Sequence, residues 1–337
     1  MAASTDLWHK TYRVRADVRT PYWFCPNDSL FPWNEDQDWN ERSATWVRDP
    51  LNPRTTAEVP LASALIMPAA PPQLWSVVRP GVPTGTVFNR KLRSKILGNS
   101  RQIWTYIPPG YDPHGEPYAL LLLFDGWAYM HLIPTPTILD NLLAERRIPP
   151  LVAVMVDNAP GARDRELGCY EPFVDFLTQE LRPWVRRRYH VTGDPAWSTI
   201  GGSSRGGLTA AFTGLRRPDL FGNVLCQSGA FMWAPPGDPE PGWLVRQFAD
   251  HARLPLRFYV DVGRLEVWPS PDDGPSTRVA NQHMRDVLHA KGYPVHYAEF
   301  GGGHDYACWE GTLPDGLLYL LGERRPARTS ATQSYRG

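Results

Sequence analysis

Residues 200–207 read Ile-Gly-Gly-Ser-Ser-Arg-Gly-Gly, and this stretch decides the fold. It contains one G-x-S-x-G pattern centred on Ser204, between an expected strand at 196–200 and an expected helix at 208–215. A chain that turns sharply from strand to helix lifts a serine hydroxyl above the end of a buried sheet, and small neighbours leave room for the turn. The alternative is a glycine-rich turn with an incidental serine, but the flanking strand and helix favour a nucleophile at Ser204.

The composition bounds the class of protein. A chain of 337 residues accommodates one large α/β domain with an extra segment. Thirty-five Lys and Arg balance thirty-five Asp and Glu, which argues against nucleic acid or an anionic membrane surface as the main partner. The four cysteines lie far apart without C-x-x-C spacing, so neither a zinc site nor a disulfide framework is indicated. Without a signal-like start or a membrane-length apolar run, the sequence predicts a cytoplasmic protein with reduced thiols.

The first part of the chain, 1–85, differs from the rest. Residues 8–18 alternate as a half-buried strand does, and 20–25 read as a second strand. Acids, tryptophans and prolines without clear periodicity follow. Two strands are not stable alone, so this segment is expected to pack on the main domain or to be the remnant of a larger β domain.

From 86 to 323, strands and helices alternate, and 324–337 reads as a polar tail. We expect strands at 101–108, 118–124, 151–156, 223–227, 256–262 and 295–300, and helices at 134–147, 172–189, 242–252 and 277–291. Such a succession predicts a mainly parallel sheet covered by helices on both faces. With the serine turn, this pattern is typical of the α/β-hydrolase fold.

A histidine and an acid complete the expected catalytic group. His304 follows Gly301-Gly302-Gly303 after the last expected strand, where a glycine-rich loop can bring an imidazole back toward Ser204. Glu266 lies three residues after Gly263, which ends the strand at 256–262, and we expect it to orient the imidazole. Two acids further along the same loop, Asp272 and Asp273, are the alternative, whereas Asp261 lies inside the strand.

An oxyanion hole needs the backbone N–H that follows the nucleophile and a second N–H from the loop after an early buried strand. The amide of Arg205 meets the first requirement. Asp125-Gly126-Trp127 occupies the second loop, so the amide of Trp127 is the expected second donor. Asp-Gly is also common in turns for conformational reasons alone.

Six motifs, in order and spacing, resemble the enterochelin (enterobactin) esterase family between about residues 48 and 322. They read Asp-Pro-Leu-Asn-Pro at 49–53, Phe-Asp-Gly at 124–126, Arg-Asp-Arg-Glu-Leu at 163–167, Gly-Gly-Ser-Ser-Arg-Gly-Gly at 201–207, Gln-Ser-Gly-Ala-Phe-Met-Trp at 227–233 and Gly-Gly-His-Asp-Tyr-Ala-Cys-Trp at 302–309. The resemblance implies a cytoplasmic serine esterase that hydrolyses ferric tricatechol siderophores to release iron. It places the family's nucleophile on Ser204, its histidine on His304 and its acid on Glu266. Members usually carry an immunoglobulin-like N-terminal domain. In this chain we expect only the last strands of such a domain, at about 11–28.

The substrate that the resemblance implies is an anionic iron complex with a flat aromatic periphery, which favours a cleft with cations and aromatic rings. Arg163, Arg205, Trp127, Trp233 and Trp309 lie in motif loops expected at the carboxyl edge of the sheet, where such folds bind ligands. Arg163 could instead pair with Glu166, and Trp233 and Trp309 could be packing residues.

The sequence leaves two other functions open. A carbohydrate or feruloyl esterase of the same superfamily is the alternative enzyme, and a non-catalytic binder of ferric siderophores is the alternative from another class. No cofactor is expected, and the siderophore esterase needs no catalytic metal, because iron arrives with the substrate.

Overall fold

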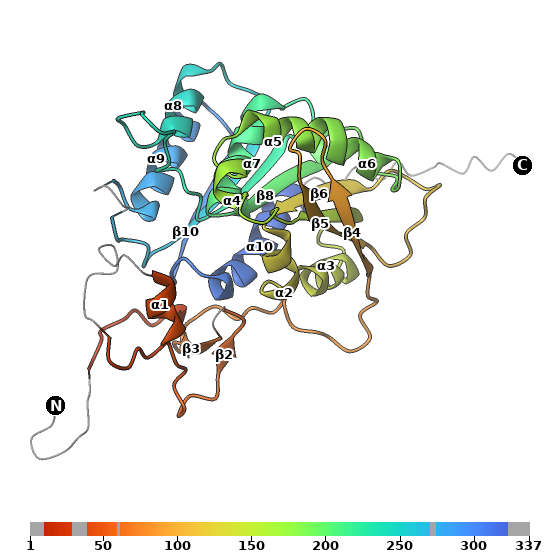
Figure 1. The fold of residues 1–337 in the computed structure, drawn as a ribbon. Coiled ribbons are helices and arrows are strands. Elements are labelled where there is room, and N and C mark those ends of the chain that lie inside the picture. Colours follow the sequence, from red (N-terminus) through yellow and green to blue (C-terminus); the bar gives the residue numbers. More distant parts are fainter. Residues whose placement is uncertain (1–9, 29–38, 59–60, 270–273, 323–337) are drawn as a thin grey trace, which may run out of the picture.

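The computed structural model describes residues 10–28, 39–58, 61–269 and 274–322 (Figure 1). Its centre is an eight-stranded sheet in the order β11-β10-β9-β8-β6-β7-β5-β4. In chain order these strands are β4 (Thr86–Arg93), β5 (Ser100–Ile107), β6 (Ala119–Phe124), β7 (Leu151–Val156), β8 (Ser198–Ser203), β9 (Asn223–Gln227), β10 (Arg257–Gly263) and β11 (Val295–Phe300). Only the pairs β4–β5 and β5–β7 are antiparallel, which confirms the mainly parallel sheet.

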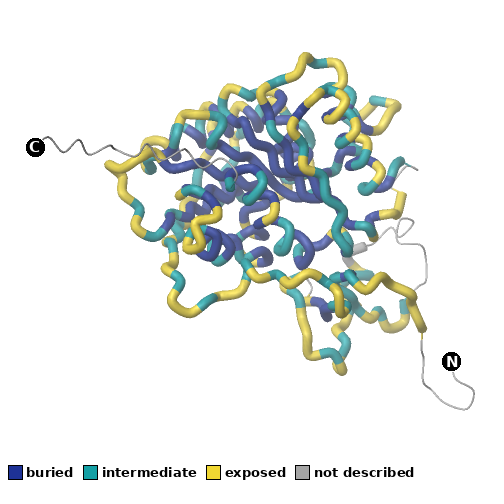
Figure 2. The backbone as a smooth tube through the Cα atoms, turned by 180° about the vertical axis from the view of Figure 1, so that it is seen from behind, coloured by how far each residue is buried: buried dark blue, intermediate teal, exposed yellow. Residues whose placement is uncertain are grey.

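Helices cover both faces of this sheet, as Figure 1 shows. One face packs against α5 (Glu171–Asp175), the π-helical turn η1 (Phe176–Leu181), α6 (Arg182–Arg186), α7 (Arg205–Arg216), α8 (Trp243–Asp250) and α9 (Thr277–Ala290). The other packs against α2 (Gly126–His131), α3 (Thr135–Ala144) and α10 (Tyr306–Leu321). Every residue of β6 and of β7 is buried, because strands covered on both faces need continuous apolar runs. Figure 2 shows that burial concentrates along these central strands.

The N-terminal segment forms a small antiparallel sheet of β1 (Arg19–Tyr22), β3 (Ala62–Ile66) and β2 (Thr55–Thr56), with β3 in the middle. Helix α1 (Trp39–Ala44) lies between β1 and β2 in sequence. Strand β1 contacts α10 of the hydrolase domain. The expected packing of this segment on the main domain is therefore present.

Several expectations need correction. The described part of the strand expected at 8–18 is not a strand: residues 10–15 are exposed and 16–17 form a turn. The strand expected at 20–25 is β1, followed by a single bridge between Phe24 and Val47.

The sequence did not indicate β3, β4 or α10. The helix expected at 172–189 is formed by α5, η1 and α6 in succession, and the expected tail at 324–337 lies outside the described residues.

Candidate active site

Ser204 stands at the turn between β8 and α7. Its backbone angles, φ 56° and ψ −121°, are strained for a residue with a Cβ. Neighbouring backbone holds the turn in place: the Ser204 amide donates to the Gln227 carbonyl at 2.9 Å, and the Ser204 carbonyl accepts from the Ala230 amide at 3.0 Å. A Cβ at Gly202 would lie 2.9 Å from the carbonyl carbon of Gly206, so the turn has no room for a larger residue there. This is the geometry expected of a nucleophile turn.

The structure brings His304 and Glu266 together. Nδ1 of His304 lies 2.7 Å from Oε2 of Glu266, whose side chain is 3% exposed against 40% for the imidazole. The other oxygen, Oε1, accepts from the Gly263 amide at 2.7 Å and from Ser228 Oγ at 2.6 Å. These hydrogen bonds hold the Glu266 carboxyl group in one place as an acceptor for His304.

The strand order places Ser204, Glu266 and His304 at the same edge of the sheet. β8, β9, β10 and β11 are parallel neighbours, so their carboxyl ends share one edge of the sheet. Ser204 follows β8, Glu266 follows β10 and His304 follows β11. The alternative acids Asp272 and Asp273 lie outside the described residues. Asp261 is fully buried in β10, and burial raises its pKa to about 8.

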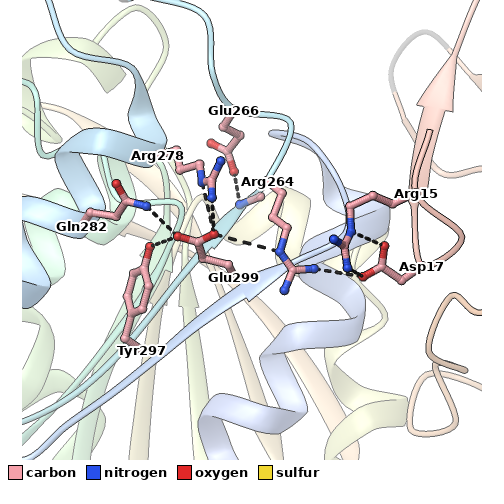
Figure 3. A network of polar contacts seen from close by, with 9 residues as sticks. Arg15, Asp17, Arg264, Glu266, Arg278, Gln282, Tyr297 and Glu299 are labelled. Atoms are coloured by element: carbon pink, nitrogen blue, oxygen red, sulfur yellow. Dashed lines mark hydrogen bonds and ion pairs between the residues drawn. The ribbon is translucent and has the colours of Figure 1, made fainter. Parts of the chain in front are cut away.

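The loop that carries Glu266 is fixed on both sides. The Glu266 carbonyl accepts from the Arg278 amide at 3.1 Å, which ties the loop to α9. Figure 3 shows Arg264, two residues earlier, between Asp17 of the N-terminal segment, at 2.9 Å, and Glu299 of β11, at 4.0 Å. Burial opposes ionisation of Glu299, but hydrogen bonds from Arg278 and from Gln282 and Tyr297 outweigh it and lower its pKa to about 2.

Trp309 lies behind the histidine and not in an open cleft. Its side chain is 4% exposed, and Nε1 donates to Ser228 Oγ at 3.0 Å. Its ring meets the His304 ring edge to face, with centroids 4.9 Å apart. Trp309 thus supports Ser228, which in turn supports Glu266. The expected contact between this ring and a ligand does not fit its burial.

The two expected oxyanion donors lie at helix starts. Arg205 is the first residue of α7, where amides lack intrahelical acceptors. The Trp127 amide, in the first turn of α2, lies 3.3 Å from Oδ1 of Asp157, a long and therefore weak contact. Before it, a Cβ on Gly126 would lie 2.7 Å from the backbone of Met155, so only glycine fits there. The Trp127 side chain is 44% exposed and stacks on His131.

Arg163 does not pair with Glu166. Its guanidinium binds Asp125 through two hydrogen bonds, Nε to Oδ1 at 2.7 Å and Nη2 to Oδ2 at 2.8 Å. Glu166 instead pairs with Arg101 at 2.9 Å, and both side chains are fully buried. Arg163 nevertheless remains 39% exposed, so it brings partly neutralised positive charge to the surface beside the α2 loop.

The remaining expected ligand-binding residues lie near this surface. Nε of Arg205 is 3.3 Å from Oδ1 of Asp164, which is itself 82% exposed. Trp233 is half-buried and meets Trp243 edge to face, with centroids 6.0 Å apart.

Tyr306 is a residue of this region that the sequence did not single out. Burial and the charge of Asp125 raise its pKa to about 12, and the charge of Arg163 opposes this shift. Its place two residues after His304 in the quoted motif is the signal that could have found it.

Two kinds of feature are absent from the residues that the structure describes. No group of three or more His, Cys, Asp or Glu side chains in this part of the chain is placed to hold a metal ion. Within the same ranges, no helix has the length and apolar character needed to cross a bilayer.

Two family models match the chain. The model described as "Putative esterase" matches residues 94–320, and the model described as "Enterochelin esterase, N-terminal" matches residues 1–76. Among curated proteins, the iron(III) enterobactin esterase of Dickeya dadantii is 32% identical over 348 residues, which cover 94% of this chain and 77% of that protein. The iron(III) enterobactin esterase of Escherichia coli strain CFT073 is 31% identical, covering 94% and 80%.

Solved structures give the same result. The enterobactin esterase of Shigella flexneri, crystallised in the presence of enterobactin, has a TM-score of 0.79 and 30% identity, covering 95% of this chain and 82% of that one. The ferric enterobactin esterase of Salmonella typhimurium has a TM-score of 0.80 at 29% identity, with the same coverage. A ferulic acid esterase from Anaeromyces mucronatus shares the fold at 20% identity, with a TM-score of 0.60 over 74% of this chain.

Proposed function

Because the chain belongs to the enterobactin esterase family and is therefore a carboxylic ester hydrolase, we propose that it hydrolyses the ester bonds of ferric tricatechol siderophores. The observation that carries the chemistry is the 2.7 Å contact between His304 and Glu266, at the same sheet edge as the strained Ser204 turn. The similarity to enterobactin esterases supports the substrate class.

The proposed mechanism assigns one task to each group. Glu266 accepts the Nδ1 proton of His304 in a hydrogen bond, which leaves Nε2 free to take the hydroxyl proton of Ser204. The serine oxygen attacks the ester carbonyl, and the amides of Arg205 and Trp127 bind the oxyanion that forms. His304 then gives its proton to the departing alkoxide, which leaves as an alcohol. Water, deprotonated by the same imidazole, attacks the acyl-serine, and collapse of that intermediate releases the acid and restores Ser204.

To bind the oxyanion, the Trp127 amide must exchange its hydrogen bond to Asp157 for one to the substrate. Their 3.3 Å contact is weak, whereas a short hydrogen bond to a developing oxyanion is strong. The contact therefore does not oppose the proposed role.

Substrate recognition is proposed for Arg163, Arg205, Trp127 and Trp233, whose side chains are all at least partly exposed. A ferric tricatecholate carries about three negative charges, and guanidinium and aromatic groups suit its flat periphery. Iron enters this proposal as the cargo of the substrate and not as a cofactor. A cytoplasmic location, as the sequence indicated, remains a prediction.

Chromatography of products tests this function against its alternatives. The protein is incubated with ferric enterobactin and, separately, with a feruloylated sugar. We expect N-acylserine products from ferric enterobactin and little ferulate from the feruloylated sugar. Preferential release of ferulate would favour a feruloyl esterase, and tight binding of ferric enterobactin without any product would favour a non-catalytic binder.

A further inference from the structure

The backbone of the N-terminal segment packs directly on the loop that carries His304. The Arg19 amide donates to the Gly301 carbonyl at 2.7 Å, and Cys308 Sγ donates to the Arg19 carbonyl at 3.1 Å. A Cβ on Gly301 would overlap the carbonyl oxygen of Asp17, and one on Gly302 would lie 2.7 Å from that of Arg19. Neither glycine has a positive φ. Close approach of the N-terminal segment therefore requires glycine at Gly301, and at Gly302 the same segment and the Cys308 side chain together leave no room for a Cβ.

Two side chains of the same segment reach the first turn of α10, which begins two residues after His304. Oε1 of Glu58 accepts from the Ala307 amide at 3.1 Å. Oγ1 of Thr20 donates to Oδ2 of Asp305 at 3.3 Å, and Oδ1 of Asp305 accepts from the Cys308 amide at 2.8 Å. The first amides of a helix lack intrahelical acceptors and carry partial positive charge. Here one carboxylate belongs to Asp305, the N-cap residue before α10, and the other to Glu58, 249 residues before Ala307 in the chain.

We propose that Glu58 and Thr20 are positioning residues for His304, holding the first turn of α10 so that the imidazole stays aligned with Ser204. The inference rests on the proposed esterase function. It means that the hydrolase domain does not align its histidine alone, because the side chains of Glu58 and Thr20, besides the backbone of Arg19, form hydrogen bonds with the residues around His304. Neither residue contacts the reacting atoms, so their effect passes through α10 and its N-cap residue Asp305.

The charge of Glu58 makes this arrangement dependent on pH. Burial and the nearby Asp305 raise the pKa of Glu58 to about 7, against the opposing effects of the Ala307 and Tyr306 amides and of His304. Tyr306 is the other titratable neighbour. Glu58 is therefore ionised, and the stronger acceptor, above about pH 7.

The same shift has an opposite effect on stability. Because the pKa of this carboxyl is higher in the folded protein than its ordinary value of 4.5, the folded state binds the proton more tightly. The stability that Glu58 contributes is present at low pH and is lost as the pH rises toward about 7. A neutral Glu58→Gln variant avoids this loss, so above pH 7 it should be at least as stable as the parent protein.

The test compares Glu58→Gln and Thr20→Val with Glu310→Gln in the full chain. Glu310 is a matched control, because it is a partly buried carboxyl on α10, at the same junction, with a pKa raised by burial. The rates are hydrolysis of p-nitrophenyl acetate and labelling of Ser204 by a fluorophosphonate, neither of which requires siderophore recognition. Thermal unfolding at pH 6 and pH 8 reports stability.

At pH 8, where the parental Glu58 is ionised, we expect Glu58→Gln to lower kcat and the labelling rate about 10- to 100-fold with little change in KM, as a misplaced catalytic group does. Its Tm at pH 8 should not fall, and the part of the pH–rate profile that follows ionisation of Glu58, at about pH 7, should disappear. Thr20→Val should lower kcat less, and Glu310→Gln should match the parent.

Parental rates in Glu58→Gln would overturn the inference. A loss of rate that occurs only together with a lower Tm at pH 8 would overturn it as well. Failure of the parent to hydrolyse ferric enterobactin would refute the proposed substrate but leave this test intact.

Discussion

At the scale of single residues, the contacts of Glu266 give the first prediction. One nearly inaccessible carboxylate accepts from the Gly263 amide, from Ser228 and from His304. Glu266→Gln keeps the size of the side chain but removes the charge that stabilises the imidazolium formed during attack. We expect kcat for ferric enterobactin to fall by up to about 10⁴-fold with folding intact. Asp272→Asn should change kcat little, and the reverse ranking would move the assignment to that loop.

Trp309 gives a second prediction at this scale. Trp309→Phe removes the Nε1 donor to Ser228 but keeps an aromatic ring beside His304. Because Ser228 then orients Glu266 less firmly, kcat should fall about 10-fold while KM stays near the parental value. Steady-state kinetics distinguishes the two roles of this ring. A raised KM at unchanged kcat would instead mean that Trp309 binds the substrate directly.

The positions of Ser204, His304 and Glu266 could be predicted because each follows a strand with a recognisable pattern, and in the structure those strands end at one sheet edge. The side-chain partners that lie far away in the chain could not be predicted. Arg163 pairs with Asp125, thirty-eight residues earlier, and no local pattern distinguishes that partner from the nearby Glu166. The sequence predicted Trp309 in an exposed motif loop. Its ring is buried because of the way α10 packs, which no local pattern indicates.

Among whole elements, the central strands were predictable and the edges were not. β6 and β7 are continuous apolar runs buried on both faces, whereas β4 is an edge strand whose residues are mostly exposed or partly exposed. Helix α10 was missed because it contains Gly311, Pro314 and Gly316, residues that normally indicate a break. In the structure a Cβ on Gly316 would lie 2.7 Å from the Leu225 side chain, so glycine there permits close packing on the sheet.

Helix α4 (Arg163–Glu166) is attached to β5 by a buried ion pair, which gives a prediction at this scale. Arg101→Leu leaves the fully buried Glu166 carboxylate without its cation, so urea unfolding should show a loss of about 3–5 kcal/mol. Arg217→Leu removes a partner from the more exposed pair with Asp219 and should cost at most about 1 kcal/mol. Equal losses for the two variants would refute the structural importance of the buried pair.

Across the whole molecule, two bodies share the candidate site. The hydrolase domain supplies Ser204, Glu266 and His304, while the N-terminal segment packs on the loop that carries His304 and binds Arg264 through Asp17. The chain has no net formal charge, so any attraction for an anionic iron complex must be local. Two partly exposed cations lie at this site: Arg163 pairs with Asp125, the residue before α2, and Arg205 is the first residue of α7.

The most direct measurement compares binding and hydrolysis of ferric enterobactin in Ser204→Ala. The change removes only a hydroxyl, so the fold and the cationic, aromatic surface should survive, and the complex should still quench tryptophan fluorescence. Product formation should fall to the residual level that an oxyanion hole and binding provide, roughly 10³- to 10⁴-fold over the uncatalysed rate and far below the parent. Hydrolysis of ferric enterobactin by Ser204→Ala at the parental rate would contradict the account.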